Sequence, residues 1–335
     1  MKTLLLGGGG FIGNGIAMQL LQTGKTSVTI ADNFFRQGGK PDKQISELEK
    51  MGVDVIEGDF TDPSSFDKLG FFDQVYMLAS VVGVDYVNSI PHEIIRINSM
   101  LIINTLEWIR KVGCGRALFS STSEAYAGAV EEFDYPIPTP EDVPLVISDI
   151  SHPRFTYAVT KMLGESGFLN YSSKLDFEAV VVRYHNVYGP RMGFKHVIPH
   201  LVQRFTNCEN PFKIYGYDQT RSFNYIDDAV NGTILAMEKG QSGEIYHIGD
   251  TVEITIEELV KYVGEIFEFH GKYENAPTYP GSVKRRCPDI EKAKKYLGYS
   301  PKTNWQLGVR KTIEWYRNYL SDCKELHESF YDPSN

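Results

Sequence analysis

Short apolar runs and longer stretches with helical periodicity alternate through the first half of this chain. The apolar runs have the length of strands and fall at residues 3–6, 27–31, 53–59, 74–79, 116–120 and 177–184. The stretches whose apolar residues recur at helical spacing include residues 14–23, 92–112 and 154–174. This alternation predicts an α/β protein in which a doubly wound parallel sheet carries helices on both faces.

The alternation becomes less regular after about residue 190, which indicates a smaller C-terminal α/β lobe. The predicted elements beyond this point are strands 212–215 and 244–248 and helices 227–238, 255–267 and 307–320. We expect a first domain at residues 1–190, onto which residues 223–250 pack back. The smaller lobe is expected to comprise 191–222 and 251–325, followed by a loose tail at 326–335. A proline- and acid-rich segment, 131–149, is expected to form a loop.

Glycines follow the first predicted strand at once, in the run Gly7-Gly8-Gly9-Gly10-Phe11-Ile12-Gly13. In such a run Gly7 permits a tight turn, Gly10 lets the backbone approach a pyrophosphate, and Gly13 allows close packing of helix on strand. The N-terminus of the next helix offers unpaired N–H groups to an anion. A flexible loop is also rich in glycine, but a position between strand and helix favours a dinucleotide-binding turn.

Asp32 ends the second predicted strand, nineteen residues after Gly13. An acidic side chain at this place accepts hydrogen bonds from the ribose hydroxyls of a bound adenosine, and it repels a 2′-phosphate. Asp32 therefore favours NAD over NADP, although the nearby Arg36 leaves NADP as the alternative cofactor.

Composition narrows the classes of partner. The 335 residues are 42% hydrophobic, enough for a large core, and the formal net charge is −9. An acidic chain without a basic run argues against nucleic acid. No apolar stretch approaches the ~20 residues that span a bilayer, and the first apolar run is too short for a signal peptide. The four cysteines are far apart and match no metal spacing, so we expect reduced thiols, no metal and a cytoplasmic protein.

Tyr157 and Lys161 lie four residues apart in a predicted helix, so their side chains share one face. A nearby ammonium favours the phenolate form and is expected to lower the pKa of Tyr157 toward working pH. Such a phenol can remove a proton from a hydroxyl. The same spacing also occurs on ordinary amphipathic helices. The dinucleotide turn and the hydroxyl cluster upstream, at residues 120–123, favour catalysis.

These features together resemble the extended short-chain dehydrogenase/reductases, in particular the NAD-dependent nucleotide-sugar epimerases, dehydratases and decarboxylases. The resemblance covers nearly the whole chain and is specific to the superfamily rather than to one reaction. Besides the glycine turn and the Tyr157–Lys161 pair, it rests on Gly58-Asp59, Leu78-Ala79-Ser80, Asn98, and residues 121–126, 183–191, 221–228 and 286–290.

The resemblance implies a Rossmann-type NAD-binding domain, a smaller nucleotide-sugar-binding lobe and a homodimer formed through helices 92–112 and 154–174. The implied catalytic residues are Thr122 at the sugar O4, Tyr157 as base, Lys161 at the nicotinamide ribose, Ser123 and Glu124. The implied NAD-binding residues are Gly7, Gly10, Phe11, Ile12, Gly13, Asp32, Asn33, Asp59, Phe60, Leu78, Ala79, Ser80, Asn98, Ser120, Tyr157, Lys161, Tyr184, Asn186 and Val187. The implied substrate-binding residues are Thr122, Asn186, Arg191, Val197, Tyr215, Arg221 and Arg286.

The reaction that follows C4 oxidation stays open at this stage. Thr122-Ser123-Glu124 resembles the triplet of UDP-glucuronate decarboxylases and of GDP-mannose 4,6-dehydratases, but the run after Ser80 lacks the proline-rich segment of those decarboxylases. We rank an epimerase or decarboxylase acting on a uronate or hexose first, a 4,6-dehydratase second and a C4 dehydrogenase third. A non-enzymatic sensor of NAD or nucleotide sugars is the alternative of another class, disfavoured by Thr122, Tyr157 and Lys161.

Overall fold

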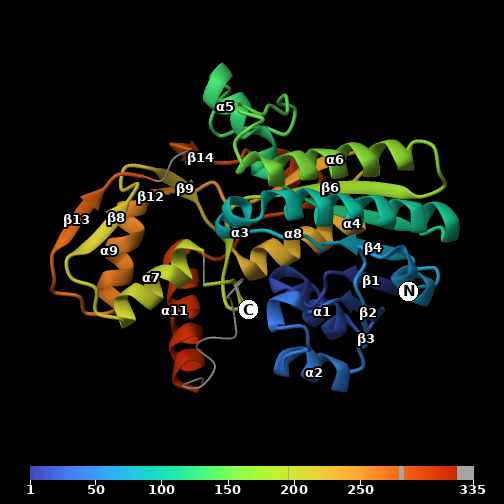
Figure 1. The fold of residues 1–335 in the computed structure, drawn as a ribbon, viewed down its shortest axis with the longest axis horizontal. Coiled ribbons are helices and arrows are strands. Elements are labelled where there is room, and N and C mark those ends of the chain that lie inside the picture. The colour runs from blue at the N-terminus through green and yellow to red at the C-terminus, as the bar shows by residue number, and fades with distance from the viewer. Residues whose placement is uncertain (195, 279–282, 323–335) are drawn as a thin grey trace.

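The computed structural model describes residues 1–194, 196–278 and 283–322, and a seven-stranded sheet forms its centre (Figure 1). Neighbouring strands are parallel throughout. In spatial order the strands are β11 (Ile245–Ile248), β6 (Glu178–Tyr184), β5 (Arg116–Thr122), β4 (Gln74–Met77), β1 (Lys2–Leu6), β2 (Ser27–Asp32) and β3 (Asp54–Glu57). The chain order reverses between β1 and β4, which opens a crevice for ligands at the carboxyl ends of these strands. The predicted fold class is confirmed.

Helices cover both faces of this sheet, as the sequence predicts. The helices of one face are α1 (Phe11–Thr23), α2 (Lys43–Lys50) and α8 (Ile226–Lys239), and those of the other are α4 (Pro91–Val112) and α6 (Phe155–Ser172). Side chains alternate between the faces of a strand, so Leu5 packs in the first core while Leu4 and Leu6 pack in the second. Each central strand is therefore apolar on both sides, which explains its continuous apolar run.

A few elements differ from the sequence expectation. Helix α1 begins at Phe11 rather than near residue 14, because the residues after Gly10 already adopt helical geometry. The segment expected as a loop from residue 131 begins inside helix α5 (Ala127–Phe133), and α3 (Val84–Ser89) was not predicted. Both are short helices of six or seven residues, too short to show an apolar period. Short 3₁₀ turns also occur in this half, at η1 (Phe35–Gln37), η2 (Pro63–Lys68) and η3 (Ser123–Tyr126).

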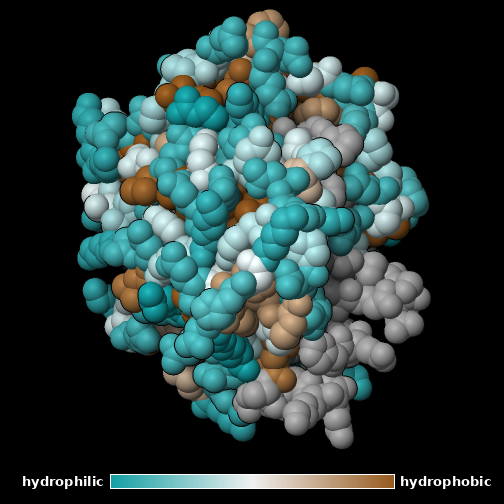
Figure 2. Space-filling model, turned by 90° about the vertical axis from the view of Figure 1, so that its left-hand side faces the viewer, coloured by the Kyte–Doolittle hydropathy of each residue, from teal (hydrophilic) through white to brown (hydrophobic). Residues whose placement is uncertain are grey.

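The later part of the chain forms smaller sheets beside the main one. Strands β8 (Phe212–Tyr215) and β13 (Tyr273–Ala276) pair in parallel, and β9 (Thr220–Ser222) lies between β12 (Glu253–Thr255) and β14 (Arg285–Arg286). Helices α7 (Val197–Thr206), α9 (Ile256–Ile266) and α11 (Trp305–Asp322) pack with them. Hydrophilic residues cover most of the outer face of this region, and hydrophobic ones lie in small separate groups (Figure 2).

Connections from the later part of the chain return to the main sheet. Strand β10 (Asn224–Tyr225) pairs with β7 (Val187–Tyr188), α8 packs on α1, and α10 (Glu291–Leu297) packs on α8. Asp228, in the first turn of α8, accepts hydrogen bonds from the backbone N–H groups of Lys302 and Thr303, each at 2.9 Å. These contacts fix the smaller sheets against the carboxyl edge of the main one.

No helix among the residues that the structure describes is both long and apolar enough to cross a bilayer. The longest of them, α4, has 22 residues, and both its first and last turns carry charged side chains. The segment 326–335, expected to be a loose tail, lies outside the described residues.

Candidate active site

The loop between β1 and α1 leaves room for an anion because it has no side chains at the critical places. Gly7 has φ +85°, and a Cβ there would clash with the backbone of Ala79 in the loop after β4. A Cβ on Gly13 would lie 2.6 Å from the Cα of Gly8, so α1 could not pack as close to β1. Within the described residues no side chain caps the N-terminus of α1. Its first N–H groups can bind a pyrophosphate, so this cradle fits a dinucleotide.

Asp32 lies beside this cradle at the end of β2. Its carboxylate accepts hydrogen bonds from the backbone N–H groups of Gly9 (2.9 Å) and Phe34 (2.8 Å). Burial raises the pKa of Asp32, and the bonds from Phe34 and Gly9 offset part of that rise. The side chain therefore also fixes the glycine loop, in addition to facing the place expected for a ribose.

Most of the residues expected to bind NAD and substrate line one cavity of about 1800 Å³. Small-molecule pockets commonly measure ~300–1,000 Å³, so this cavity has room for a dinucleotide and a second ligand. The expected residues that line it are Gly7, Gly10, Phe11, Ile12, Gly13, Asp32, Asn33, Asp59, Phe60, Leu78, Ala79, Ser80, Ser120, Thr122, Ser123, Glu124, Tyr157, Lys161, Tyr184, Asn186, Val187, Val197, Tyr215, Arg221 and Arg286.

Asn98 and Arg191 are the expected residues that lie outside the cavity lining. The buried Asn98 side chain accepts a hydrogen bond from the Val81 N–H (2.8 Å) and donates one to the Val81 carbonyl (3.1 Å). It thereby holds the loop after β4 that forms one wall of the cavity. Arg191 forms an ion pair with Asp42 (2.9 Å) and donates to the Gly9 carbonyl (3.4 Å). Its position supports the glycine loop from behind.

Tyr157 and Lys161 project from α6 into the cavity next to Thr122, which ends β5. The Lys161 Nζ lies 5.6 Å from the centre of the Tyr157 ring and donates to the Ser120 carbonyl at 2.8 Å. Burial lowers the pKa of Lys161 to about 7. Burial, and then the charge of Glu124, raise the pKa of Tyr157. The expected lowering of the Tyr157 pKa is therefore wrong for the protein alone, because a buried phenolate loses its hydration.

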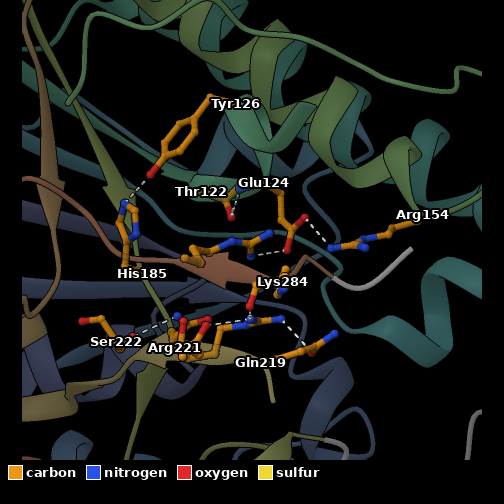
Figure 3. A network of polar contacts seen from close by, with 12 residues as sticks. Thr122, Glu124, Tyr126, Arg154, His185, Gln219, Arg221, Ser222 and Lys284 are labelled. Atoms are coloured by element: carbon orange, nitrogen blue, oxygen red, sulfur yellow. Dashed lines mark hydrogen bonds and ion pairs between the residues drawn. The ribbon is translucent and has the colours of Figure 1, made fainter. Parts of the chain in front are cut away.

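Glu124 lies between two arginines that come from distant parts of the chain (Figure 3). One carboxylate oxygen accepts from Arg286 Nη1 at 2.5 Å, and the other accepts from Arg154 Nη2 at 3.2 Å. Burial alone would raise the pKa of Glu124, but Arg286 and Arg154 together lower it to about 2. Sequence reasoning missed Arg154. Its spacing of three residues before Tyr157, which places both on one side of the start of α6, was the available signal.

Arg221 adds a third cation near this group. It lies on β9, donates to the Thr220 carbonyl (2.7 Å) and to Gln219 (3.2 Å), and lines the cavity with Tyr215. Burial and the neighbouring Arg286 charge lower its pKa to about 10, so it stays cationic at neutral pH. Cations at this place suit the phosphates of a nucleotide.

A buried polar layer supports these groups from below. Arg183 on β6 holds Glu165 on α6 through two hydrogen bonds of 2.9 and 2.8 Å, and Ser121 donates to the same carboxylate. Tyr126 OH lies 3.1 Å from His185 Nε2, to one side of Glu124 (Figure 3). This layer joins β5, β6 and α6, so the strand end that carries Thr122 is fixed relative to Tyr157.

Comparison with known proteins identifies the family. The profile of the NAD dependent epimerase/dehydratase family matches residues 3–249. A UDP-N-acetyl-alpha-D-glucosaminuronate decarboxylase of Bacillus cytotoxicus is 31% identical over 332 residues, covering 96% of this chain and 99% of the relative. UDP-glucuronic acid decarboxylase 6 of Arabidopsis thaliana is 30% identical, over 97% of this chain and 91% of the relative.

A solved structure agrees with this assignment. The UDP-glucuronic acid 4-epimerase of Bacillus cereus, in complex with UDP-glucuronic acid and NAD, is 26% identical and has a TM-score of 0.82. The match covers 95% of this chain and 100% of that one. The chain therefore belongs to the NAD dependent epimerase/dehydratase family. The expected membership of the extended short-chain dehydrogenase/reductase group, and with it an enzyme rather than a non-enzymatic sensor, is confirmed.

Proposed function

We propose that this protein oxidises a UDP-uronate at C4 with NAD and then removes its carboxylate as carbon dioxide. The observation that carries the proposal is the Arg154–Glu124–Arg286 group beside Tyr157 and Thr122. Two guanidinium groups next to the expected catalytic tyrosine suit a sugar that carries its own carboxylate. The names of the relatives, two of them uronate decarboxylases, support the same substrate class.

In the oxidation step Tyr157 removes the proton of the C4 hydroxyl while Thr122 hydrogen-bonds the same oxygen. Bound NAD would accept the C4 hydride and return it after the carboxylate has left. The Lys161 ammonium, 5.6 Å from the centre of the Tyr157 ring, opposes the effect of burial by favouring the phenolate when it carries charge. Its pKa of about 7 leaves it partly charged near neutral pH.

Decarboxylation follows from the oxidation state of C4. A ketone at C4 is β to the C6 carboxylate, so the C5–C6 bond can break and its electron pair can pass to the C4 oxygen as an enolate. Thr122 and Tyr157 lie at the position expected for that oxygen and stabilise the negative charge through hydrogen bonds. A proton then returns to C5. The arginines orient the carboxylate and do not take part in bond breaking.

We further propose that the protein forms a homodimer through α4 and α6. We also propose that its cofactor is NAD rather than NADP, since Asp32 faces the position of a 2′-phosphate. The Asp32 carboxylate is held rigid by Gly9 and Phe34, so it cannot turn away from that position without losing two hydrogen bonds. Repulsion and lost hydrogen bonding would act together against NADP.

The experiment is a mass-spectrometric screen of nucleotide sugars with the purified protein, supplied with NAD or with NADP. Conversion of a UDP-uronate with loss of carbon dioxide is the expected result. An unchanged mass with inverted C4 would make the protein a uronate 4-epimerase, loss of water a dehydratase, and loss of two hydrogens a C4 dehydrogenase. Failure to convert any uronate while a neutral sugar is converted contradicts the proposal.

A further inference from the structure

The carboxylate of Glu124 already occupies a site built for a carboxylate. Each of its oxygens pairs with a different guanidinium, Arg286 at 2.5 Å and Arg154 at 3.2 Å. The three side chains come from η3, from the residue before α6 and from β14, so the fold brings them together at the junction of the main sheet and the smaller lobe. Their side chains are 10–27% exposed, which places the group at the cavity wall rather than in the core.

The group keeps one hydrogen-bond donor that the described residues do not use. Arg154, Arg286 and Arg221 act on Glu124 and on Glu131, whose pKa burial raises. Glu132 adds a third carboxylate near Glu131. Among the described residues the buried Nη2 of Arg286 has no hydrogen-bond partner. A guanidinium with an unused N–H donor can hold the carboxylate of a bound ligand as well as Glu124.

We propose that Arg154 is the residue that selects a sugar with a C6 carboxylate. Until the substrate binds, the Glu124 carboxylate occupies the position beside Arg154 that the substrate carboxylate will take. This inference rests on the proposed function. The incoming carboxylate displaces Glu124 from Arg154, so one ion pair replaces another. A neutral hydroxymethyl group cannot make this exchange, because it would leave the guanidinium without an anion or fail to enter. The exchange discriminates a uronate from the corresponding hexose.

The exchange also changes Glu124 itself. While it pairs with both arginines its pKa stays at about 2, so it neither donates nor accepts a proton near neutral pH. Once displaced from Arg154 it loses one of the two charges that lower its pKa, and the burial that raises the pKa remains. Binding of a substrate carboxylate therefore raises the pKa of Glu124.

The first test compares UDP-glucuronate with UDP-glucose, two ligands that differ in the carboxylate. Arg154→Gln is expected to weaken UDP-glucuronate binding about 10- to 100-fold, the range for a hydrogen bond to a charged group, and to change UDP-glucose binding less than about 3-fold. Calorimetry in the presence of NAD at fixed ionic strength measures both. Arg110→Gln, an exposed arginine of α4 paired with Glu107, is the control for loss of one charge. If Arg154→Gln weakens binding of both nucleotide sugars equally, Arg154 contacts a part that the two ligands share, and the proposal is overturned.

The second test removes the internal carboxylate. Glu124→Gln is expected to bind UDP-glucuronate several-fold more tightly than the unmodified protein, because no charged group has to be displaced, while turnover falls. UDP-glucose affinity should not change. Weaker UDP-glucuronate binding by Glu124→Gln contradicts the proposal that Glu124 occupies the site of the substrate carboxylate. If the unmodified protein does not bind UDP-glucuronate at all, the proposed function fails. If it binds UDP-glucuronate but Arg154→Gln and Glu124→Gln do not change the affinity as expected, only the carboxylate exchange between Arg154 and Glu124 is contradicted.

Discussion

Lys161 is a buried ammonium whose charge opposes folding. It is 3% exposed, and burial lowers its pKa from the ordinary 10.5 to about 7. Between these two pH values the unfolded chain binds the proton and the folded chain does not, so stability contributed by this group rises with pH across that window. Below pH 7 both states are protonated, and the folded state bears the whole cost of burying the charge.

Lys161→Met is therefore expected to stabilise the protein while abolishing oxidation. The gain should be largest at pH 6, on the order of a few kcal/mol by the conversion of ~1.4 kcal/mol per pKa unit, and smaller at pH 9. Thermal unfolding at the two pH values measures it, and absorbance of NADH measures oxidation. Lys174→Met, an exposed lysine beyond the end of α6, should change neither. A lower Tm for Lys161→Met at pH 6 would contradict this account of the buried charge.

The sequence predicts the position of a functional residue well where that residue belongs to a motif of fixed spacing along the chain. Tyr157 and Lys161 face the cavity as the helical spacing predicts, and the glycine turn has the geometry that its spacing implies. The direction of the Tyr157 pKa was not predictable, because it depends on burial and on Glu124, which lies on a different element. The partnership of Arg154 with Arg286 depends on a tertiary contact that no local pattern encodes.

Helix α6 packs closely against strand β5, and this contact determines how far Lys161 can reach. Gly164 sits on the buried face of α6, and a Cβ there would overlap the ring of Phe119 on β5. That ring is fully buried and stacks on Phe168 at 5.1 Å, so it has little room to move. The close approach lets Lys161 Nζ contact the Ser120 carbonyl at 2.8 Å.

Gly164→Ala is expected to push α6 away from β5, with a cost of about 1–3 kcal/mol from overpacking, and to reduce oxidation as Lys161 withdraws. Gly167→Ala on the same helix is the matched control. Its Cβ would meet only the flexible end of Leu106 within 3 Å, so the ordinary preference of helices for alanine should make it neutral or stabilising. Denaturant unfolding and NAD reduction measure both variants. Equal stability of the two would show that β5 and α6 can separate freely.

At the scale of elements the prediction succeeds for long periodic segments and fails for short ones. The central strands and the helices α4 and α6 are found within a few residues of their expected bounds, because apolar faces specify them. The pairing of β7 with β10, for example, involves strands of two residues. Strands of that length carry no alternation and are set by tertiary hydrogen bonds alone.

The active site is a property of the whole molecule. Its residues come from Gly7 near the N-terminus to Arg286 on β14, and the reversal of strand order brings them to one edge. The sequence predicts that edge from the parallel topology, but not how the later segments close over it. Buried contacts such as Asp228 with Lys302 and Thr303 determine that closure, and their partners lie more than seventy residues apart.

The outer face of α4 and α6 carries apolar residues that the fold of one chain leaves exposed. Ile95 and Ile103 on α4 are 47% and 49% exposed, and Val159 and Leu163 on α6 are 36% and 41% exposed. The two helices lie side by side (Figure 1), and residues four or eight apart share a helix face. The arrangement differs from the mainly hydrophilic face of the smaller lobe (Figure 2). Pairing of this surface with that of a second chain would bury these side chains in a four-helix interface.

Ile103→Asp is therefore expected to turn a dimer into a monomer. The substitution places two charges, one from each chain, in an apolar contact related by two-fold symmetry, where desolvation and mutual repulsion act together. Sedimentation at micromolar concentration measures the mass of both forms. Phe133→Asp on α5 is the control, because Phe133 is 63% exposed and lies on a different element. A monomeric mass for the unmodified protein rules out the dimer. Dissociation by Phe133→Asp with Ile103→Asp still dimeric would move the interface from α4 and α6 to α5.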